Sequence, residues 1–181
     1  MIKTDSNGLP VWASVGKKRL AHIERVTSLL RAWGAAMRLD RDEAVAWIDA
    51  GAWHDSLRDE SEAELRRITG DDETPAELLH GPAAAVRLAD EGETRQHVLN
   101  AIRFHTVGAP DWARTGRALY MADYLEPGRK FSREDRFFLA AQVPHSFDAV
   151  FRQVVRFRLD WSVREGNPIF PETVALWNSL R

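Results

Sequence analysis

The sequence predicts an all-α fold. Apolar residues recur three and four positions apart over long stretches, which is the spacing that places them on one face of an α-helix. Residues that favour helix starts and helix ends separate these stretches. The alternation typical of β-strands is not convincing anywhere in the 181 residues, and no internal repeat is visible. We therefore expect one helical domain over residues 1–181, in which residues 1–12 form a loose N-terminal segment.

Three helices are expected in the N-terminal part of the chain. The first covers residues 14–37, where apolar residues keep helical spacing. Asp40 can cap the second helix, because its side chain can accept a hydrogen bond from a free N–H of the first turn. This second helix leads to His54 and Asp55. Ser61 can cap a short third helix that ends near residue 70.

The middle of the chain is expected to contain two further helices. Pro75 suits the first position of a helix that includes His80, because proline has no N–H to leave unpaired there. A break at Gly92 separates this helix from another over residues 94–104. That helix leads directly to His105.

The C-terminal part of the chain is also expected to be helical. One helix over residues 113–125 carries Asp123 and ends before a Pro-Gly pair. Two or three helices follow, including residues 146–164 and 171–180. All the expected elements are thus helices, joined by short polar segments.

Histidines and aspartates occur in a fixed order on or at the ends of these helices. They are His22, His54, Asp55, His80, His105 and Asp123. An unpaired polar group on a buried helix face costs about 1–3 kcal/mol, which a metal ion would offset. Imidazole nitrogen and carboxylate oxygen, in a chain without cysteine, suit iron, manganese, cobalt, nickel or zinc. The order therefore predicts a metal site formed by several helices.

Composition and charge exclude several classes of protein. The net charge of −2 argues against general nucleic-acid binding, which needs a basic surface. No stretch approaches the roughly 18–20 apolar residues that cross a bilayer, and the N-terminus lacks the apolar core of a secretory signal. We expect a cytoplasmic protein without nucleic-acid or membrane partners, either a monomer or a homodimer.

The ligand types indicate a reaction class. A carboxylate next to a histidine can bridge two metal ions while other imidazoles hold each ion separately. Two ions a few ångströms apart lower the pKa of bound water and neutralise charge on phosphate oxygens. Hydrolysis of a phosphoester or phosphoanhydride is the most direct interpretation.

The spaced motifs resemble a known superfamily. They are R-L-A-H at 19–22, W-H-D-S-L-R-D at 53–59, L-L-H-G-P at 78–82, A-I-R-F-H-T-V-G at 101–108, Y-M-A-D-Y-L-E-P-G-R at 120–129 and N-P-I-F-P-E-T-V-A-L-W-N-S-L at 167–180. Their order resembles the HD-domain phosphohydrolases, and more narrowly the HD-type symmetrical bis(5′-nucleosyl)-tetraphosphatases. The resemblance covers roughly residues 10–181 and implies an HD-domain helical bundle.

This resemblance implies a reaction and a set of ligands. The narrower family splits diadenosine tetraphosphate into two ADP molecules by attack of a metal-activated hydroxide, and it is associated with iron. Two divalent ions are implied, with manganese, cobalt, nickel or zinc as alternatives to iron. The first ion would be held by His22, His54, Asp55 and Asp123, and the second by Asp55, His80 and His105.

The resemblance also implies residues that handle the substrate, a small-molecule nucleotide. Arg129 would pair with phosphate oxygens, and Thr106 and Gly108 would shape the mouth of the pocket. Arg58 would act near the metals together with His54 and Asp55. The alternative for Arg129 is an ordinary cation near a helix C-terminus, and the alternative for Arg58 is an ordinary solvated charge.

The sequence departs from the family at two positions, and alternatives stay open. Arg58 stands where the family usually has lysine, which puts the preference for diadenosine tetraphosphate in doubt. Phe170 stands where related chains often carry histidine, with little effect expected on the metals. The alternatives are a phosphohydrolase acting on another nucleotide, or a nucleotide-binding regulator without catalysis.

Overall fold

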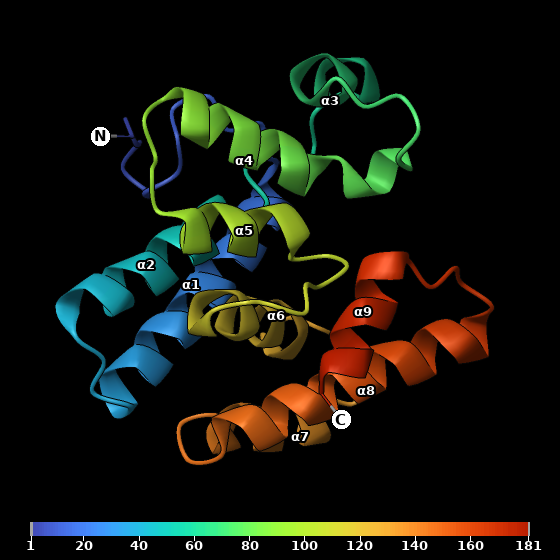
Figure 1. The fold of residues 1–181 in the computed structure, drawn as a ribbon. Helices are drawn as coiled ribbons and strands as arrows, with labels where there is room; N and C mark the ends of the chain where they lie inside the picture. The colour runs from blue at the N-terminus through green and yellow to red at the C-terminus, as the bar shows by residue number, and fades with distance from the viewer. Residues whose placement is uncertain (1, 181) are drawn as a thin grey trace.

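The computed structural model describes residues 2–180 and shows an all-α fold (Figure 1). Within that range it has nine α-helices, one 3₁₀ helix and no β-strand. The helices are α1 (Lys17–Ala36), α2 (Arg41–Trp53), α3 (Glu62–Thr69), η1 (Ala76–Leu78), α4 (His80–Asp90), α5 (Gln96–Phe104), α6 (Arg114–Leu125), α7 (Arg133–Gln142), α8 (Phe147–Glu165) and α9 (Pro171–Ser179). The predicted fold class is confirmed. None of the described helices is long and apolar enough to cross a membrane.

The predicted caps form at two helix starts. Asp40 accepts a hydrogen bond of 2.8 Å from the Glu43 N–H at the start of α2. Ser61 accepts one of 3.3 Å from the Glu64 N–H at the start of α3. These bonds pair N–H groups that a helix start would otherwise leave without partners.

The helix expected from Pro75 onward is divided in two. Pro75 has an extended ψ of 135° and precedes the single turn of η1. The α-helix itself begins at His80, so this histidine lies at the first position of α4 rather than inside a longer helix. This division lets the His80 ring bond back to the turn before it.

The N-terminal segment is not loose in its described part, residues 2–12. Thr4 and Pro10 form an isolated β-bridge, and Leu9 is only 2% exposed. The indole N–H of Trp53 donates to the Gly8 carbonyl at 3.1 Å. The segment lacks helical spacing, but it covers the end of α2, where the His54-Asp55 pair lies.

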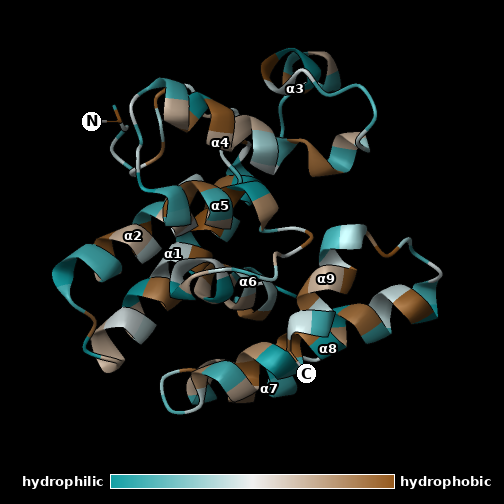
Figure 2. Ribbon diagram, in the orientation of Figure 1, coloured by the Kyte–Doolittle hydropathy of each residue, from teal (hydrophilic) through white to brown (hydrophobic). Residues whose placement is uncertain are grey.

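Five helices converge around the site. In Figure 1, α1, α2, α5 and α6 occupy the centre, and α4 lies across α5. Most helices combine hydrophobic and hydrophilic residues (Figure 2), as expected when one face lies in the core. Helix α6 is buried along most of its length, including Asp123.

Two glycines permit the close approaches that bring ligands from different helices together. A Cβ atom at Gly51 would lie 2.7 Å from a methyl carbon of Leu30 and 3.3 Å from Cα of Thr27, so the absence of a side chain favours close packing of α2 on α1. A Cβ atom at Gly81 would lie 2.7 Å from the Ile102 carbonyl oxygen at the end of α5. The first approach brings His54 beside His22, and the second brings the start of α4 against the end of α5.

Candidate metal centre

The six histidines and aspartates of the expected ligand set lie together in the structure. They come from α1, the residues after α2, the start of α4, the residue after α5, and α6. All six are buried, although each carries a polar or ionisable group: His22, His54, Asp55, His80, His105 and Asp123. Burial of so many polar groups at one point requires strong mutual interactions or a bound cation.

Asp55 lies at the centre of the cluster, and its two oxygens face different imidazoles. Oδ1 lies 3.2 Å from Nε2 of His80 and 3.4 Å from Nε2 of His105. Oδ2 lies 3.5 Å from Nε2 of His54 and 3.6 Å from Nε2 of His22. The carboxylate therefore separates one pair of imidazoles from the other.

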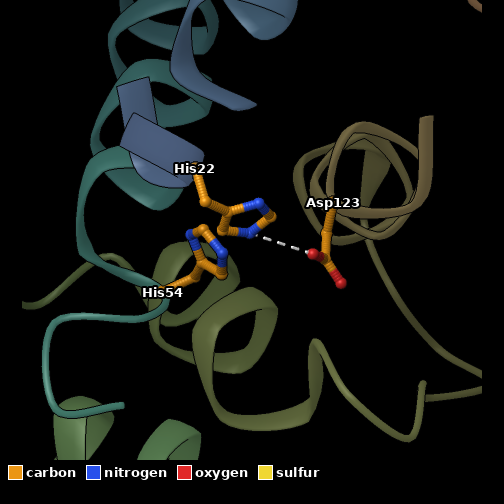
Figure 3. Close-up of side chains that lie close together, drawn as sticks. All are labelled: His22, His54 and Asp123. Atoms are coloured by element: carbon orange, nitrogen blue, oxygen red, sulfur yellow. Dashed lines mark ion pairs between the residues drawn. The ribbon is translucent and has the colours of Figure 1, made fainter. Parts of the chain in front are cut away.

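Asp123 completes the half of the cluster that contains His22 and His54. Its Oδ1 lies 3.2 Å from Nε2 of His22, and Figure 3 shows this carboxylate facing the two histidine rings from α6. Donor atoms of His22, His54 and Asp123 lie within 4.8 Å of one another, as do donor atoms of His54, Asp55 and His105. Each of these groups has a composition and spacing that suit a divalent metal ion.

The outer nitrogen of each imidazole is held by an acceptor. Nδ1 of His54, His80 and His105 lies 2.9, 3.0 and 2.7 Å from the carbonyl oxygens of Gly51, Glu77 and Ile102, respectively. A carbonyl can only accept, so Nδ1 carries the proton and Nε2 keeps its lone pair for the cluster. Nδ1 of His22 instead lies 3.2 Å from Oε1 of Glu126. Acceptors of this kind orient histidine ligands in metal sites.

The inner nitrogens fit a cation. Nε2 of His54 is buried without a hydrogen-bond partner among the described residues, and Nε2 of His22 faces the carboxylate of Asp123 at 3.2 Å. Nε2 of His80 and Nε2 of His105 lie 3.1 Å apart. Two lone pairs repel at such a separation unless a proton or a metal ion lies between them or beside them. The residues present therefore suit a divalent ion.

The protonation states also suit a metal. Burial lowers the pKa of His54 to about 4 and lowers that of His80 as well, so both rings are neutral at pH 7. Burial alone would raise the pKa values of Asp55 and Asp123, but the surrounding histidines and arginines hold both well below 3.8. Burial of His22 is outweighed by its contacts with Asp123 and Glu126, which raise its pKa above 6.5. Neutral imidazoles and ionised carboxylates are the forms that bind metals, so His54, His80 and both aspartates are in the binding form, whereas a metal at His22 would displace a proton.

Three arginines contact the carboxylates of the cluster. Nη1 of Arg19 lies 2.6 Å from Oδ2 of Asp55. Nη2 of Arg129 lies 2.6 Å from Oδ1 of Asp123, and Arg129 also donates to the Asp123 carbonyl. Nη1 of Arg158 lies 3.6 Å from Oδ2 of Asp123, while its Nη2 donates to the carbonyl of Thr106 at 2.9 Å. These cations balance the negative charge of the cluster and line its approaches.

Two cavities lie beside the cluster. One, of about 600 Å³, is lined by Asp123, Thr106 and Arg129 together with the aromatic rings of Tyr124, Phe131 and Trp161. The other, of about 660 Å³, is lined by His22, Arg129 and a basic group. That basic group consists of Lys17, Lys18, Arg19 and Arg25. Arg129 lines both cavities, which places its guanidinium group between an aromatic surface and a basic one.

Two of the expected substrate residues lie away from these cavities. Gly108 has a φ of +92° and packs against Leu176 of α9, so its missing side chain serves the contact with that helix. Arg58 is half-buried and lines neither cavity. Its charge adds to the burial that lowers the pKa of His80.

Sequence reasoning missed Glu126 and Arg158. Glu126 is 2% exposed, holds Nδ1 of His22 and forms an ion pair with Arg25. It lies within the A-D-Y-L-E-P-G-R motif, so its place three residues after Asp123 was a signal that could have indicated it. Nothing in the local sequence of Arg158 indicates its contact with Asp123.

The amino-acid sequence of the chain is similar to those of named bacterial proteins. No protein-family model matches it. It is 29% identical over 153 residues to a symmetrical bis(5′-nucleosyl)-tetraphosphatase of Bacillus subtilis, covering 80% of this chain and 81% of that protein. It is 33% identical over 105 residues to a protein of the same name from Halalkalibacterium halodurans, covering 58% of this chain and 55% of that one.

A solved structure shares the fold. It is the crystal structure of a predicted HD superfamily hydrolase involved in NAD metabolism, from Clostridium acetobutylicum. The TM-score is 0.77 at 25% identity, over 92% of this chain and 90% of that one. The chain has the HD-domain fold. The resemblance expected from the motifs is thus confirmed, and the HD-domain relatives support a hydrolase with a metal-binding site and a nucleotide substrate.

Proposed function

We propose that this HD-domain chain hydrolyses dinucleoside polyphosphates and cleaves diadenosine tetraphosphate symmetrically into two ADP molecules. The observation that carries the proposal is the position of Asp55, whose two oxygens face two separate pairs of imidazole nitrogens. Such a carboxylate suits a bridge between two metal ions. The names and identities of the relatives support the substrate.

The proposed site holds two divalent ions, iron in the first place, with manganese, cobalt, nickel or zinc compatible with the same donors. His22, His54, Asp55 and Asp123 would hold one ion, and Asp55, His80 and His105 the other. The chemistry supplied by such ions is activation of water near neutral pH and neutralisation of phosphate charge. The carbonyls behind His54, His80 and His105 fix the rings so that Nε2 faces the ions.

The cavities suit a substrate with aromatic ends and an anionic middle. Trp161 offers a ring against which a base can stack, and Tyr124 and Phe131 line the same cavity, which includes Asp123. The basic group of the other cavity can attract phosphate oxygens. Arg129, which lines both cavities, is placed to contact the polyphosphate between them. A dinucleoside polyphosphate has this distribution of aromatic and charged parts.

A second candidate is hydrolysis of a different nucleotide at the same metals. It is favoured by Arg58, which stands where the resembling family usually has lysine and which lines neither cavity. The structural neighbour is described as involved in NAD metabolism, which also widens the range of nucleotides to be tested.

The first experiment is anaerobic purification followed by metal analysis and a panel of nucleotides with product identification. We expect about two divalent ions per chain and ADP as the sole product from diadenosine tetraphosphate. Production of AMP together with ATP would contradict symmetrical cleavage. Metal content without turnover of diadenosine tetraphosphate, but with turnover of another nucleotide, would favour the second candidate.

The variant Arg129→Ala is expected to raise KM while leaving the metals bound. Removing a charged hydrogen-bond donor to phosphate should lower kcat/KM by about 10- to 100-fold. Steady-state kinetics and metal analysis provide the measurement. Arg133→Ala is the control, because Arg133 is an exposed arginine at the start of α7 and lines neither cavity beside the metals. Unchanged KM and kcat in Arg129→Ala would show that this guanidinium group does not bind substrate.

A further inference from the structure

Arg136 is a buried arginine whose guanidinium group has no polar partner. It lies on α7, and its side chain and backbone together are only 3% exposed. Nε, Nη1 and Nη2 are all buried, and none makes a hydrogen bond within residues 2–180. Across the same residues, no carboxylate oxygen lies within 4.0 Å of it. Buried guanidinium groups almost always have such partners.

Two aromatic rings lie against this guanidinium group. Its central carbon lies 3.7 Å from the ring centre of Phe131 and 3.9 Å from that of Tyr124. The two rings are inclined at 71° to each other, so at most one of them can stack on the guanidinium plane. Both stabilise the positive charge, but neither offers an oxygen acceptor to the N–H groups. Burial lowers the pKa of Arg136, which reflects the cost of keeping this charge away from water. The edge of the group therefore lacks an anion.

The surroundings indicate where that anion belongs. Arg136 lines the aromatic cavity beside Asp123, together with Arg129 and Arg158. Arg129 and Arg158 both contact Asp123, so their charges are already balanced in part. Among these three arginines in the described chain, Arg136 alone has no recorded carboxylate partner.

We propose that Arg136 binds phosphate oxygens of the polyphosphate substrate through the edge of its guanidinium group. This inference rests on the proposed function, because it assigns a further specificity-determining residue to the same site. The planar fork of arginine matches two oxygens of a phosphate, and the rings of Phe131 and Tyr124 restrict the position of that fork. Arg136 binds the part of the polyphosphate that extends from the metals into the aromatic cavity.

The phosphate reaches Arg136 through movement of Phe131. This ring is 52% exposed, although it covers one face of a buried cation. It precedes Ser132, which has a φ of +45°, an unfavourable conformation for a residue with a side chain. The segment between α6 and α7, which also carries Arg129, thus contains both the exposed ring that covers Arg136 and a residue in an unfavourable backbone conformation.

The test compares Arg136→Met with the wild-type chain, both loaded with metal. The probes are inorganic tripolyphosphate and a methylene-bridged, non-hydrolysable analogue of diadenosine tetraphosphate, with binding measured by titration calorimetry. We expect Arg136→Met to bind both probes about 10- to 100-fold more weakly. Its Tm without ligand should equal or exceed that of the wild type, because an unpaired buried charge has been removed. Arg152→Met, at an exposed position on α8 that lines none of the cavities around Arg129 and Arg136, is the matched control and should bind both probes like the wild type.

Several results would overturn this inference. They are wild-type affinity of Arg136→Met for the analogue, failure of the wild type to bind either probe, and weakened binding of tripolyphosphate alone.

If Arg136→Met does not fold, Arg136→Lys is the variant that tests the inference, because lysine keeps the charge but not the fork. We expect Arg136→Lys to bind the analogue several-fold more weakly, and equal affinity would overturn the assignment. The readout is binding, so a wild type that binds the analogue without hydrolysing its natural counterpart would contradict the proposed function and leave this inference standing.

Discussion

Asp55→Asn is expected to lower turnover by about 10³-fold or more and to remove bound metal, while the helical fold is kept. The substitution preserves the shape of the side chain and removes the negative charge that faces four imidazoles. Metal ions contribute several kcal/mol of transition-state stabilisation in phosphate hydrolysis, and about 1.4 kcal/mol corresponds to a factor of ten in rate. Metal analysis, kcat and circular dichroism are the measurements.

The control for this change is Asp90→Asn. Asp90 is exposed at the end of α4, so the same loss of charge there should leave metal content and kcat unaffected. Wild-type turnover by Asp55→Asn would contradict the metal mechanism. Loss of the helical circular dichroism signal would instead indicate that Asp55 acts chiefly in stability.

Single-histidine variants distinguish one ion from two. His80 lies on the Oδ1 side of Asp55 and His22 on the Oδ2 side. If Asp55 bridges two ions, His80→Ala should release one ion and keep the other, whereas Asp55→Asn should weaken both. Equal and complete loss of metal in all variants would be expected of one shared ion.

The helices could be predicted because their signals are local. Spacing of apolar residues and the capping residues Asp40 and Ser61 depend on neighbours a few positions away. The start of α4 was placed too early, because Pro75 precedes the 3₁₀ turn of η1 and the α-helix begins only at His80. The packing of Leu9 was missed because a short segment without helical spacing gives no local sign of the surface that it covers.

The candidate ligands could be predicted from their order, whereas their surroundings could not. The motifs contain His22, Asp55 and Asp123, and these residues lie together in the structure. The environment of Arg136 depends on the packing of α7 against the loop before it, which no spacing in the sequence reveals. The contact of Gly108 could not be predicted either, because its neighbour in the structure, Leu176, lies 68 positions away in the sequence.

Glu126→Gln is expected to weaken metal binding by about 10- to 100-fold, the usual effect of removing a group that orients a histidine ligand. Glu126 is buried and its Oε1 lies 3.2 Å from Nδ1 of His22. Burial would raise its pKa, but its contacts with His22, Arg25 and the Gly128 N–H lower the pKa to about 2. The carboxylate is therefore charged at pH 7 and makes His22 a stronger ligand. Glutamine keeps a hydrogen-bond acceptor for His22 but removes that charge.

A competition titration against a coloured chelator measures this effect, with Glu134→Gln on the exposed surface of α7 as the matched control. Excess metal should restore much of the kcat of Glu126→Gln, because His22 and the other ligands remain in place. No added metal should restore Asp55→Asn, since the central ligand itself is changed. This contrast separates a residue that orients a ligand from one that holds the ions. Wild-type metal affinity in Glu126→Gln would show that His22 is held by the packing of α1 alone, through neighbours such as Ile23 and Val26.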